Sequence, residues 1–180
     1  MSTTIKFPPA KEIALIGILA ALNITSRIYL QFLPNIKPVT SIIIISVLLF
    51  GLSFGIKLTF VTTIVSNVFL GMGLWTVFQI LAWVVICLLS EAVKRLFLLK
   101  KKSPPLLFMA IFSSLMGYVF GFVVSFEQLC YGGWGLFLPY WIAGLTFDTL
   151  HAGGNFFFYL ICSPILMKVF KIEAKKLAKK

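Results

Sequence analysis

The chain alternates between long apolar segments and short breaks that carry proline, glycine or lysine. A helix of about 20 apolar residues crosses the hydrocarbon core of a bilayer, which is roughly 30 Å thick. The segments therefore predict an all-α membrane protein with six transmembrane helices in a single domain, residues 1–180. The expected helices cover residues 10–33, 39–53, 57–71, 75–99, 105–126 and 136–170.

The second and third helices are expected to divide one continuous apolar run, residues 39–71. A single helix of that length would extend ~50 Å, which is too long for one crossing. Its centre, GLSFGIK, holds two glycines and Lys57, so we expect the break there. Pro34 and Pro38 end the first helix, and Pro164 predicts a kink in the last one.

Composition supports a membrane protein. The chain is 60% hydrophobic and 12% charged, with a mean hydropathy of +1.04, whereas about 25% of the residues in soluble domains are charged. The first apolar segment is long enough to be a permanent span, so we expect no cleaved signal peptide. The three cysteines, Cys87, Cys130 and Cys162, have no metal-type spacing and are expected to be buried apolar residues.

The net charge of +11 does not indicate nucleic acid, because the basic residues gather on one side of the predicted topology. Arg27 and Lys37 alone fall on the other side. Cytoplasmic links carry most of the Lys and Arg in membrane proteins, so both termini are expected in the cytoplasm. Anionic lipid headgroups are expected to contact these basic residues. The cytoplasmic set is Lys6, Lys11, Lys57, Lys94, Arg95, Lys100, Lys101, Lys102, Lys168, Lys171, Lys175, Lys176, Lys179 and Lys180.

The opposite, outer end is rich in aromatic residues and glycine, in the stretches PNIKP, GMGLW and EQLCYGGWGLFLPYW. Two interpretations remain open. Glycine and large rings suit a ligand pocket, because the backbone can approach a ligand and rings supply apolar area with a polar tip. The same rings also suit an aromatic belt at the headgroup level. The aromatic residues concerned are Tyr29, Trp75, Tyr131, Trp134, Tyr140 and Trp141.

Polar side chains lie within the apolar segments. Asp148, His151 and Asn155 follow helical spacing on one face. Ionisable groups inside a membrane are costly unless they are paired or face a cavity. Arg27 lies about 9 Å and Asp148 ~13 Å in from the outer end of their helices, so an Arg27–Asp148 pair is geometrically allowed. The alternative is that these groups only tie helices together.

The first helix carries a stripe of small residues, Ala10, Ala14, Gly17 and Ala21. Small residues let another helix approach closely. The stripe indicates either packing inside this protein or docking to a different subunit.

These features resemble the substrate-binding S components of energy-coupling factor (ECF) vitamin transporters, which have six helices and cytoplasmic termini. Their first helix carries an Ala-x-x-x-Ala-type docking motif like the stripe above. NIKPVTSIIII (35–45), SNVFLGMGLWTVFQILAW (66–83) and FDTLHAGGN (147–155) are similar, in this order, to the branch assigned to cobalamin and related micronutrients.

The resemblance implies a vitamin-binding cavity that faces outward, and reorientation against a transmembrane coupling subunit powered by two cytoplasmic ATPases. Cobalamin or a related corrinoid is the leading substrate. The alternatives are riboflavin, pantothenate or a folate-like vitamin, or a structural membrane subunit without transport. The residues implied to line the cavity are Lys37, Asn67, Trp75, Gln79, Tyr131, Trp134, Tyr140 and Asp148.

No catalysis, cofactor or metal is expected. Glu91-x-x-x-Arg95 and His151-x-x-x-Asn155 resemble parts of the intramembrane CaaX-processing protease family, but a two-histidine site cannot be built because His151 is the only histidine. The chain also lacks the G-x-x-x-x-G-K-[ST] phosphate loop. For His151 we favour hydrogen bonding within the helix bundle over ligation of a corrinoid cobalt.

Overall fold

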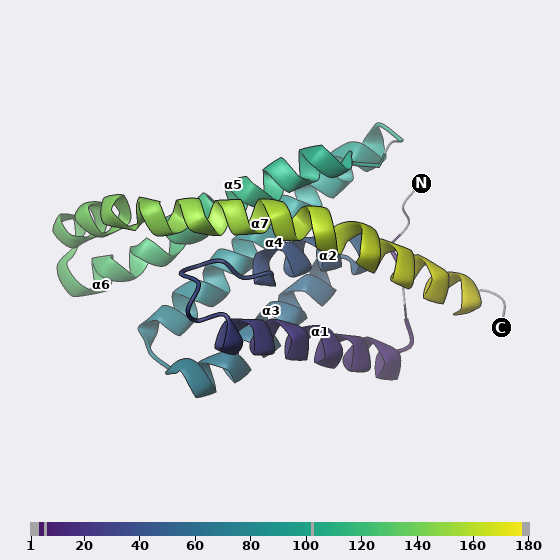
Figure 1. Cartoon of the computed structure of the whole chain (residues 1–180), viewed down its shortest axis with the longest axis horizontal. Coiled ribbons are helices and arrows are strands. Elements are labelled where there is room, and N and C mark those ends of the chain that lie inside the picture. Colours follow the sequence, from purple (N-terminus) through teal and green to yellow (C-terminus); the bar gives the residue numbers. More distant parts are fainter. Residues whose placement is uncertain (1–3, 6, 102, 178–180) are drawn as a thin grey trace.

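The computed structural model describes residues 4, 5, 7–101 and 103–177, and these residues form a bundle of antiparallel helices (Figure 1). Within these ranges no strand is present. The chain crosses the bundle back and forth, and a short hairpin turn precedes the last helix. The elements are α1 (Pro9–Tyr29), α2 (Val39–Phe50), α3 (Leu52–Leu70), α4 (Leu74–Leu99), α5 (Leu106–Ser125), η1 (Phe126–Gln128), α6 (Leu129–Gly132) and α7 (Trp134–Leu177).

Five helical segments are long and apolar enough to cross a membrane: α1, α3, α4, α5 extended through α6, and α7. The remaining helix, α2, has 12 residues, about 18 Å at 1.5 Å per residue. It therefore falls short of the roughly 30 Å hydrocarbon core. The expected six spans correspond to five long helices and one short apolar helix.

The short helix α2 lies at the centre of the bundle. All twelve of its residues are buried, and it contacts α1, α3, α4, α5 and α7. A helix that is hydrophobic all round belongs in the interior, and the sequence of α2, VTSIIIISVLLF, has this character. The link before it folds back into the bundle, so α2 begins well inside the molecule (Figure 1).

The break after α2 differs from the expected one. The chain turns at Gly51 alone, with φ 93° and ψ 172°, and α3 begins at the next residue. Lys57 was expected at the break, as the first residue of the third helix, but it lies farther inside α3, where its ammonium pairs with Glu12 of α1 at 2.8 Å. Gly51 was the residue that decided the break, because this backbone conformation is essentially restricted to glycine.

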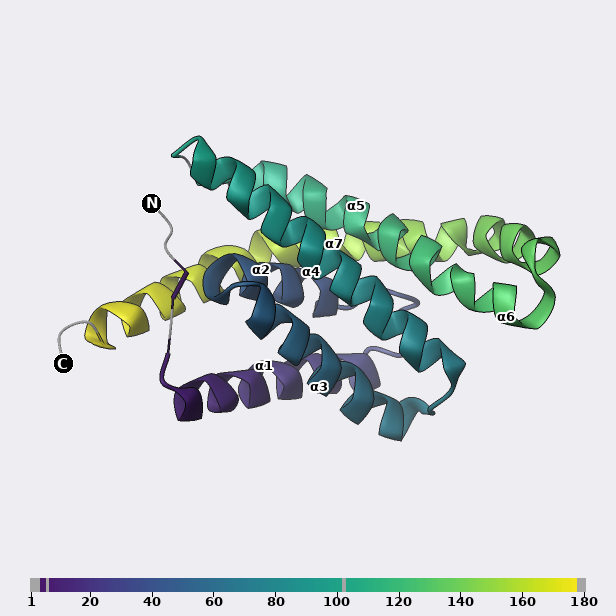
Figure 2. The same ribbon diagram turned by 180° about the vertical axis from the view of Figure 1, so that it is seen from behind.

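The expected last helix, 136–170, belongs to a longer helix that runs through both Pro139 and Pro164. It packs along α5 (Figure 2). The first helix ends at Tyr29, four residues before its expected end. The fourth and fifth helices agree with the expected ranges to within one residue.

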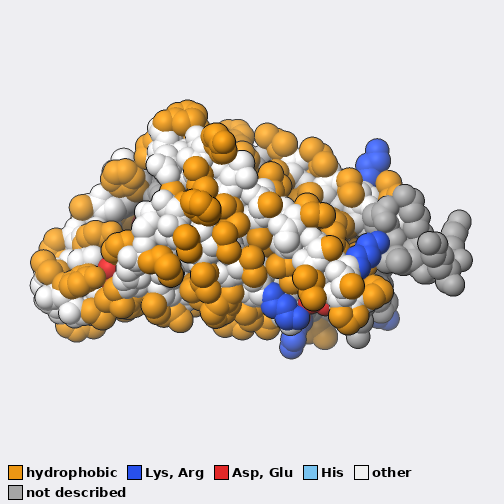
Figure 3. Space-filling model, turned by 90° about the horizontal axis from the view of Figure 1, so that it is seen from below, with side chains coloured by type: hydrophobic (Ala, Val, Ile, Leu, Met, Phe, Trp, Pro, Cys, Tyr) orange, Lys and Arg blue, Asp and Glu red, His pale blue; other side chains and the backbone are white. Residues whose placement is uncertain are grey.

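The start of α1, the α4–α5 link and the described end of α7 lie at the same end of the bundle (Figure 1). In the view of Figure 3, the visible Lys and Arg side chains gather toward this end. We call it the basic end and its opposite, with α6, the hairpin end. Lys6, Lys102, Lys179 and Lys180 lie outside the described residues, as do the side chains of Lys171, Lys175 and Lys176.

We predict that Gly51→Ala lowers the free energy of unfolding by about 1–3 kcal/mol, because the added Cβ disfavours the backbone conformation at this turn. Thermal unfolding in detergent measures the change. Gly153→Ala is the matched control, since a Cβ there would meet no atom within 4 Å. Equal stability of the two variants would contradict the strained turn.

Candidate ligand-binding site

Two adjoining cavities lie among α4, α5, α7 and the α1–α2 link, and because they share three wall residues we describe them as the wide and narrow lobes of one site. The wide lobe has a volume of about 420 Å³ and the narrow lobe about 100 Å³, and both are lined by Asn35, Gln79 and Phe120. The remaining walls of the wide lobe are Gly121, Val124, Ser125, Tyr140, Ala143, Gly144, Phe147 and Asp148. The remaining walls of the narrow lobe are Arg27, Lys37, Val39, Trp83 and His151.

The wide lobe carries one carboxylate on apolar and aromatic walls. Asp148 of α7 approaches α5 at Gly121, where any Cβ would overlap its carboxylate. Asp148 is buried, and it forms no hydrogen bond or ion pair with another described residue. Its oxygens are therefore available to a hydrogen-bond donor on a ligand.

Arg27 of α1 is buried against neutral partners in the narrow lobe. Its Nη1 donates to Ser66 Oγ at 2.7 Å, and its Nη2 donates to Asn67 Oδ1 at 3.0 Å and Gln79 Oε1 at 3.1 Å. The guanidinium carbon lies 5.2 Å from the ring centroid of Trp83, at cation–π distance. The Arg27–Asp148 pair that the sequence allowed is not formed, because α3 and α4 present three oxygen acceptors instead.

These bonds also fix the orientation of Gln79. Its Oε1 accepts from Arg27 and from Asn67 Nδ2, the latter at 3.0 Å. Asn67 also donates to Thr76 Oγ1 at 2.9 Å, so it supports Gln79 from behind. With its carbonyl oxygen occupied, Gln79 is left with an amide N–H₂ that has no bond to another described residue.

His151 belongs to a hydrogen-bonded chain on the inner wall. Trp83 Nε1 donates to Thr40 Oγ1 at 3.0 Å, and Thr40 Oγ1 lies 3.0 Å from His151 Nε2. Indole N–H only donates, so the Thr40 oxygen accepts from Trp83. The other imidazole nitrogen of His151, Nδ1, is buried and has no partner in the described part of the chain. Hydrogen bonding of His151 within the bundle is thereby confirmed.

Asn155 ties α7 to α2 differently from the expectation. Its backbone carbonyl accepts from Ser41 Oγ at 3.0 Å, while its buried side-chain amide has no partner among the described residues. The i,i+7 spacing from Asp148 correctly indicated an inward face. The spacing gave no information about which atoms of Asn155 would form the bond.

Lys37 stands in the link between α1 and α2, half-buried at the narrow lobe. Its ammonium forms no hydrogen bond or ion pair with any residue that the structure describes. It is therefore a cation without an anionic partner.

Half of the expected lining residues are in the cavity wall: Lys37, Gln79, Tyr140 and Asp148. Asn67 lies behind the wall, where its side chain donates to Gln79. The other three are exposed outside both lobes, with exposed fractions of 40% for Trp75, 60% for Tyr131 and 65% for Trp134. Their exposure fits the aromatic belt.

Sequence reasoning had not assigned Asn35, Phe120 and Trp83 to the lining. Asn35 and Trp83 lie in the quoted stretches, so those stretches held the signal. Phe120 lies in an apolar helix where no pattern distinguishes it from neighbouring phenylalanines. The three quoted stretches meet at this cavity: 35–45 supplies Asn35, Lys37 and Val39, 66–83 supplies Gln79 and Trp83, and 147–155 supplies Phe147, Asp148 and His151.

The stripe of small residues on α1 faces outward. Ala10, Ala14, Gly17 and Ala21 are all exposed, and a Cβ on Gly17 would meet no atom within 4 Å. The buried face of α1 is formed by other residues, Ile16, Leu19, Ala20, Asn23 and Arg27. Packing of the stripe against this protein's own helices is therefore not observed.

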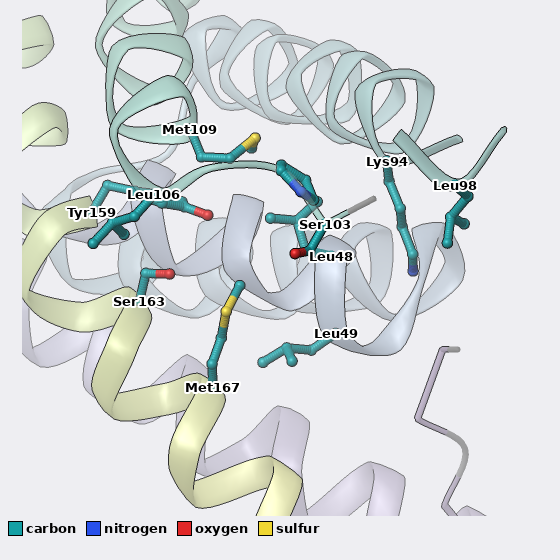
Figure 4. A pocket seen from close by; sticks show the side chains of 11 residues that line it. Leu48, Leu49, Lys94, Leu98, Ser103, Leu106, Met109, Tyr159, Ser163 and Met167 are labelled. Atoms are coloured by element: carbon teal, nitrogen blue, oxygen red, sulfur yellow. The ribbon is translucent and has the colours of Figure 1, made fainter. Parts of the chain in front are cut away.

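A separate cavity of about 160 Å³ lies toward the basic end, among α2, α5, α7 and the α4–α5 link (Figure 4). Its walls are mostly apolar, and Lys94 reaches its edge. The ammonium of Lys94 donates to Thr4 Oγ1 at 3.0 Å and to the carbonyl of Val47 at 3.1 Å. Lys94 thus joins the N-terminal segment to α2, and none of the expected site residues lines this cavity.

The three cysteines and the Glu91–Arg95 motif lie outside the walls of the two lobes. Cys87 is buried and Cys162 half-buried, but Cys130 is exposed, which corrects the expectation for that residue. Glu91 and Arg95 form an ion pair one turn apart along α4, at 2.9 Å. In the described ranges no three His, Cys, Asp or Glu side chains cluster closely enough to hold a metal ion.

Comparison of the chain with protein-family models, curated proteins and solved structures finds no significant match in any of the three.

The two cations of the narrow lobe should respond differently to substitution. We predict that Arg27→Met lowers the free energy of unfolding by about 1.5–3 kcal/mol, because it leaves the acceptors on Ser66, Asn67 and Gln79 without their charged donor. Lys37→Met should change it by less than about 0.5 kcal/mol, because no bond is lost. Chemical unfolding in detergent compares the two, and a larger loss for Lys37→Met would contradict the assigned bonds.

Proposed function

We propose that this chain is the substrate-binding S component of an ECF-type vitamin importer in a prokaryotic cell membrane. The observation that carries the proposal is the convergence of the three family-like stretches on one two-lobed cavity. These stretches are far apart in the sequence, and each contributes polar side chains to the same space. A ligand site is the function that such a convergence supports best.

In the proposed orientation, the basic end is cytoplasmic and the hairpin end faces outward, as the distribution of Lys and Arg favours. The chain then crosses the membrane six times, with α2 and its inward-folded link together making one crossing. Both termini lie in the cytoplasm, where basic residues meet anionic lipid headgroups. The cavity opens toward the outside.

The transport step requires partners. Substrate enters the cavity from outside, and the chain then reorients against a transmembrane coupling subunit, driven by two cytoplasmic ATPases. This chain binds and delivers substrate but performs no catalysis. The exposed stripe on α1 supports docking, because small side chains on an outward face leave room for a partner helix.

Cobalamin or a related corrinoid is the leading substrate, because the quoted stretches resemble that branch. The cavity volume favours a second candidate. A lobe of about 420 Å³ falls in the range of roughly 300–1,000 Å³ that is usual for small-ligand pockets. This volume suits riboflavin, pantothenate or a folate-like vitamin more closely than a corrinoid.

Calorimetry on the purified full-length chain tests the proposal with a panel of cobalamin, cobinamide, riboflavin, pantothenate and folate. We expect one vitamin to bind with a dissociation constant of about 1 μM or tighter, which corresponds to roughly 8 kcal/mol. Tight binding of a vitamin other than a corrinoid would overturn the proposed substrate but leave the proposed family assignment unchanged. Absence of binding across the panel would favour a structural subunit.

Substitutions on α4 should distinguish residues of the cavity wall from exposed aromatic residues by their effect on vitamin affinity. We predict that Gln79→Ala weakens vitamin binding about 10-fold or more, because it removes an oriented amide from both lobes. Trp75→Ala, one turn earlier on α4, should change affinity less than about 3-fold, since this ring lies outside both lobes. Calorimetry with the same vitamin measures both affinities. A larger loss for Trp75→Ala than for Gln79→Ala would place the ligand outside this cavity.

Docking should depend on the small residues of α1. We predict that Gly17→Leu or Ala14→Leu abolishes co-purification with the coupling subunit but leaves vitamin affinity unchanged, because a bulky side chain blocks close helix approach. Gly135→Leu adds the same bulk at the hairpin end, where a Cβ also meets nothing within 4 Å. Assembly that survives in the α1 variants would assign the stripe to lipid contact.

A further inference from the structure

The narrow lobe presents hydrogen-bond donors and positive charge without a carboxylate. Its lining includes Arg27 and Lys37, and the carboxylate nearest in the cavity, Asp148, lines the wide lobe instead. Neither cation forms an ion pair with a described acidic residue. The narrow lobe and the wide lobe therefore have opposite charge character.

Two donors in the narrow lobe have no bond to another described residue. The Lys37 ammonium is one. The second is the side-chain amide of Gln79, whose carbonyl oxygen already accepts from Arg27 and Asn67.

Two neighbouring cations in a partly desolvated space are unfavourable by themselves. Like charges repel, and the repulsion is stronger where water is displaced. Arg27 is 7% exposed, and Lys37 is half-buried beside it. Buried charges are stabilised when they are paired, so an anion at this point would satisfy both cations and the neighbouring donors.

We propose that the narrow lobe is a subsite for a carboxylate or phosphate group of the transported ligand, bound chiefly by Lys37, Arg27 and the Gln79 amide. This inference rests on the proposed function, because the body of the ligand would occupy the wide lobe. There Asp148 accepts hydrogen bonds from N–H or O–H groups. The substrate class is therefore a dipolar molecule with an acidic end and donor groups at the other end.

The first experiment uses two matched vitamin pairs that differ in the acidic group: pantothenate and panthenol, and riboflavin 5′-phosphate and riboflavin. Calorimetry on the full chain should show the acidic member binding about 10- to 100-fold more tightly. Lys37→Met should remove that advantage, and Lys37→Arg should retain most of it. Lys100→Met, at the exposed end of α4, is the matched charge control.

One outcome is that the protein binds the acidic and the neutral member of a vitamin pair with equal affinity, and that Lys37→Met leaves both affinities unchanged. That result would overturn the anion subsite and leave the vitamin-binding proposal intact. A second experiment tests anion binding independently of vitamin binding. Thermal unfolding in low-salt detergent is followed with benzoate, inorganic phosphate and, as a neutral control, benzamide. We expect stabilisation by the two anions that Lys37→Met abolishes.

If benzoate or phosphate stabilises the chain while no vitamin binds, the anion subsite stands and the importer proposal falls. If neither small anion nor acidic vitamin has an effect that depends on Lys37, the subsite is wrong. Nanodiscs of phosphatidylcholine and phosphatidylglycerol distinguish the other source of phosphate. A Lys37-dependent effect of phosphatidylglycerol alone would assign the lobe to a lipid headgroup and overturn the proposal.

Discussion

The Arg27 guanidinium joins α1 to α3 and α4 inside the bundle, and the geometry of the cavity depends on it. In apolar surroundings a charged group needs several acceptors, and Ser66, Asn67 and Gln79 supply them from two neighbouring helices. The same bonds orient Gln79, whose amide then faces the cavity. One buried cation thus sets both the packing of three helices and the chemistry of the wall.

The second constraint is the placement of α2. Because the α1–α2 link folds inward, a helix of 12 residues reaches the centre of the bundle, where all of its residues are buried. Its start carries Val39 and Thr40 at the narrow lobe and next to His151. At its other end, the glycine-specific turn at Gly51 lets α3 begin at once. The short helix therefore contributes Val39 to the wall of the narrow lobe.

The two ends of the bundle differ in chemistry. Lysines at the basic end pair with Glu12 or with neutral oxygens, as Lys57 and Lys94 do. At the cavity, Lys37 and Asp148 have no partner within the described chain, and they lie in different lobes. Ionisable groups inside a membrane are costly unless they are paired or face a cavity, so these two unpaired groups are consistent with the proposed ligand site.

The sequence by itself determined the helical class, four of the links and the concentration of basic residues at one end, because length, proline and lysine act locally. The resemblance of three stretches to a known family placed Lys37, Gln79, Tyr140 and Asp148 among the expected lining residues, and these four line the cavity. Only the tertiary structure decided which aromatic rings face the cavity and which acceptors Arg27 binds. The physical reason is that lipid-facing and core-facing positions are equally apolar in a membrane protein, so hydrophobic periodicity does not separate Phe120 from an exposed ring. The partner of a buried charge likewise depends on how helices distant in sequence are brought together.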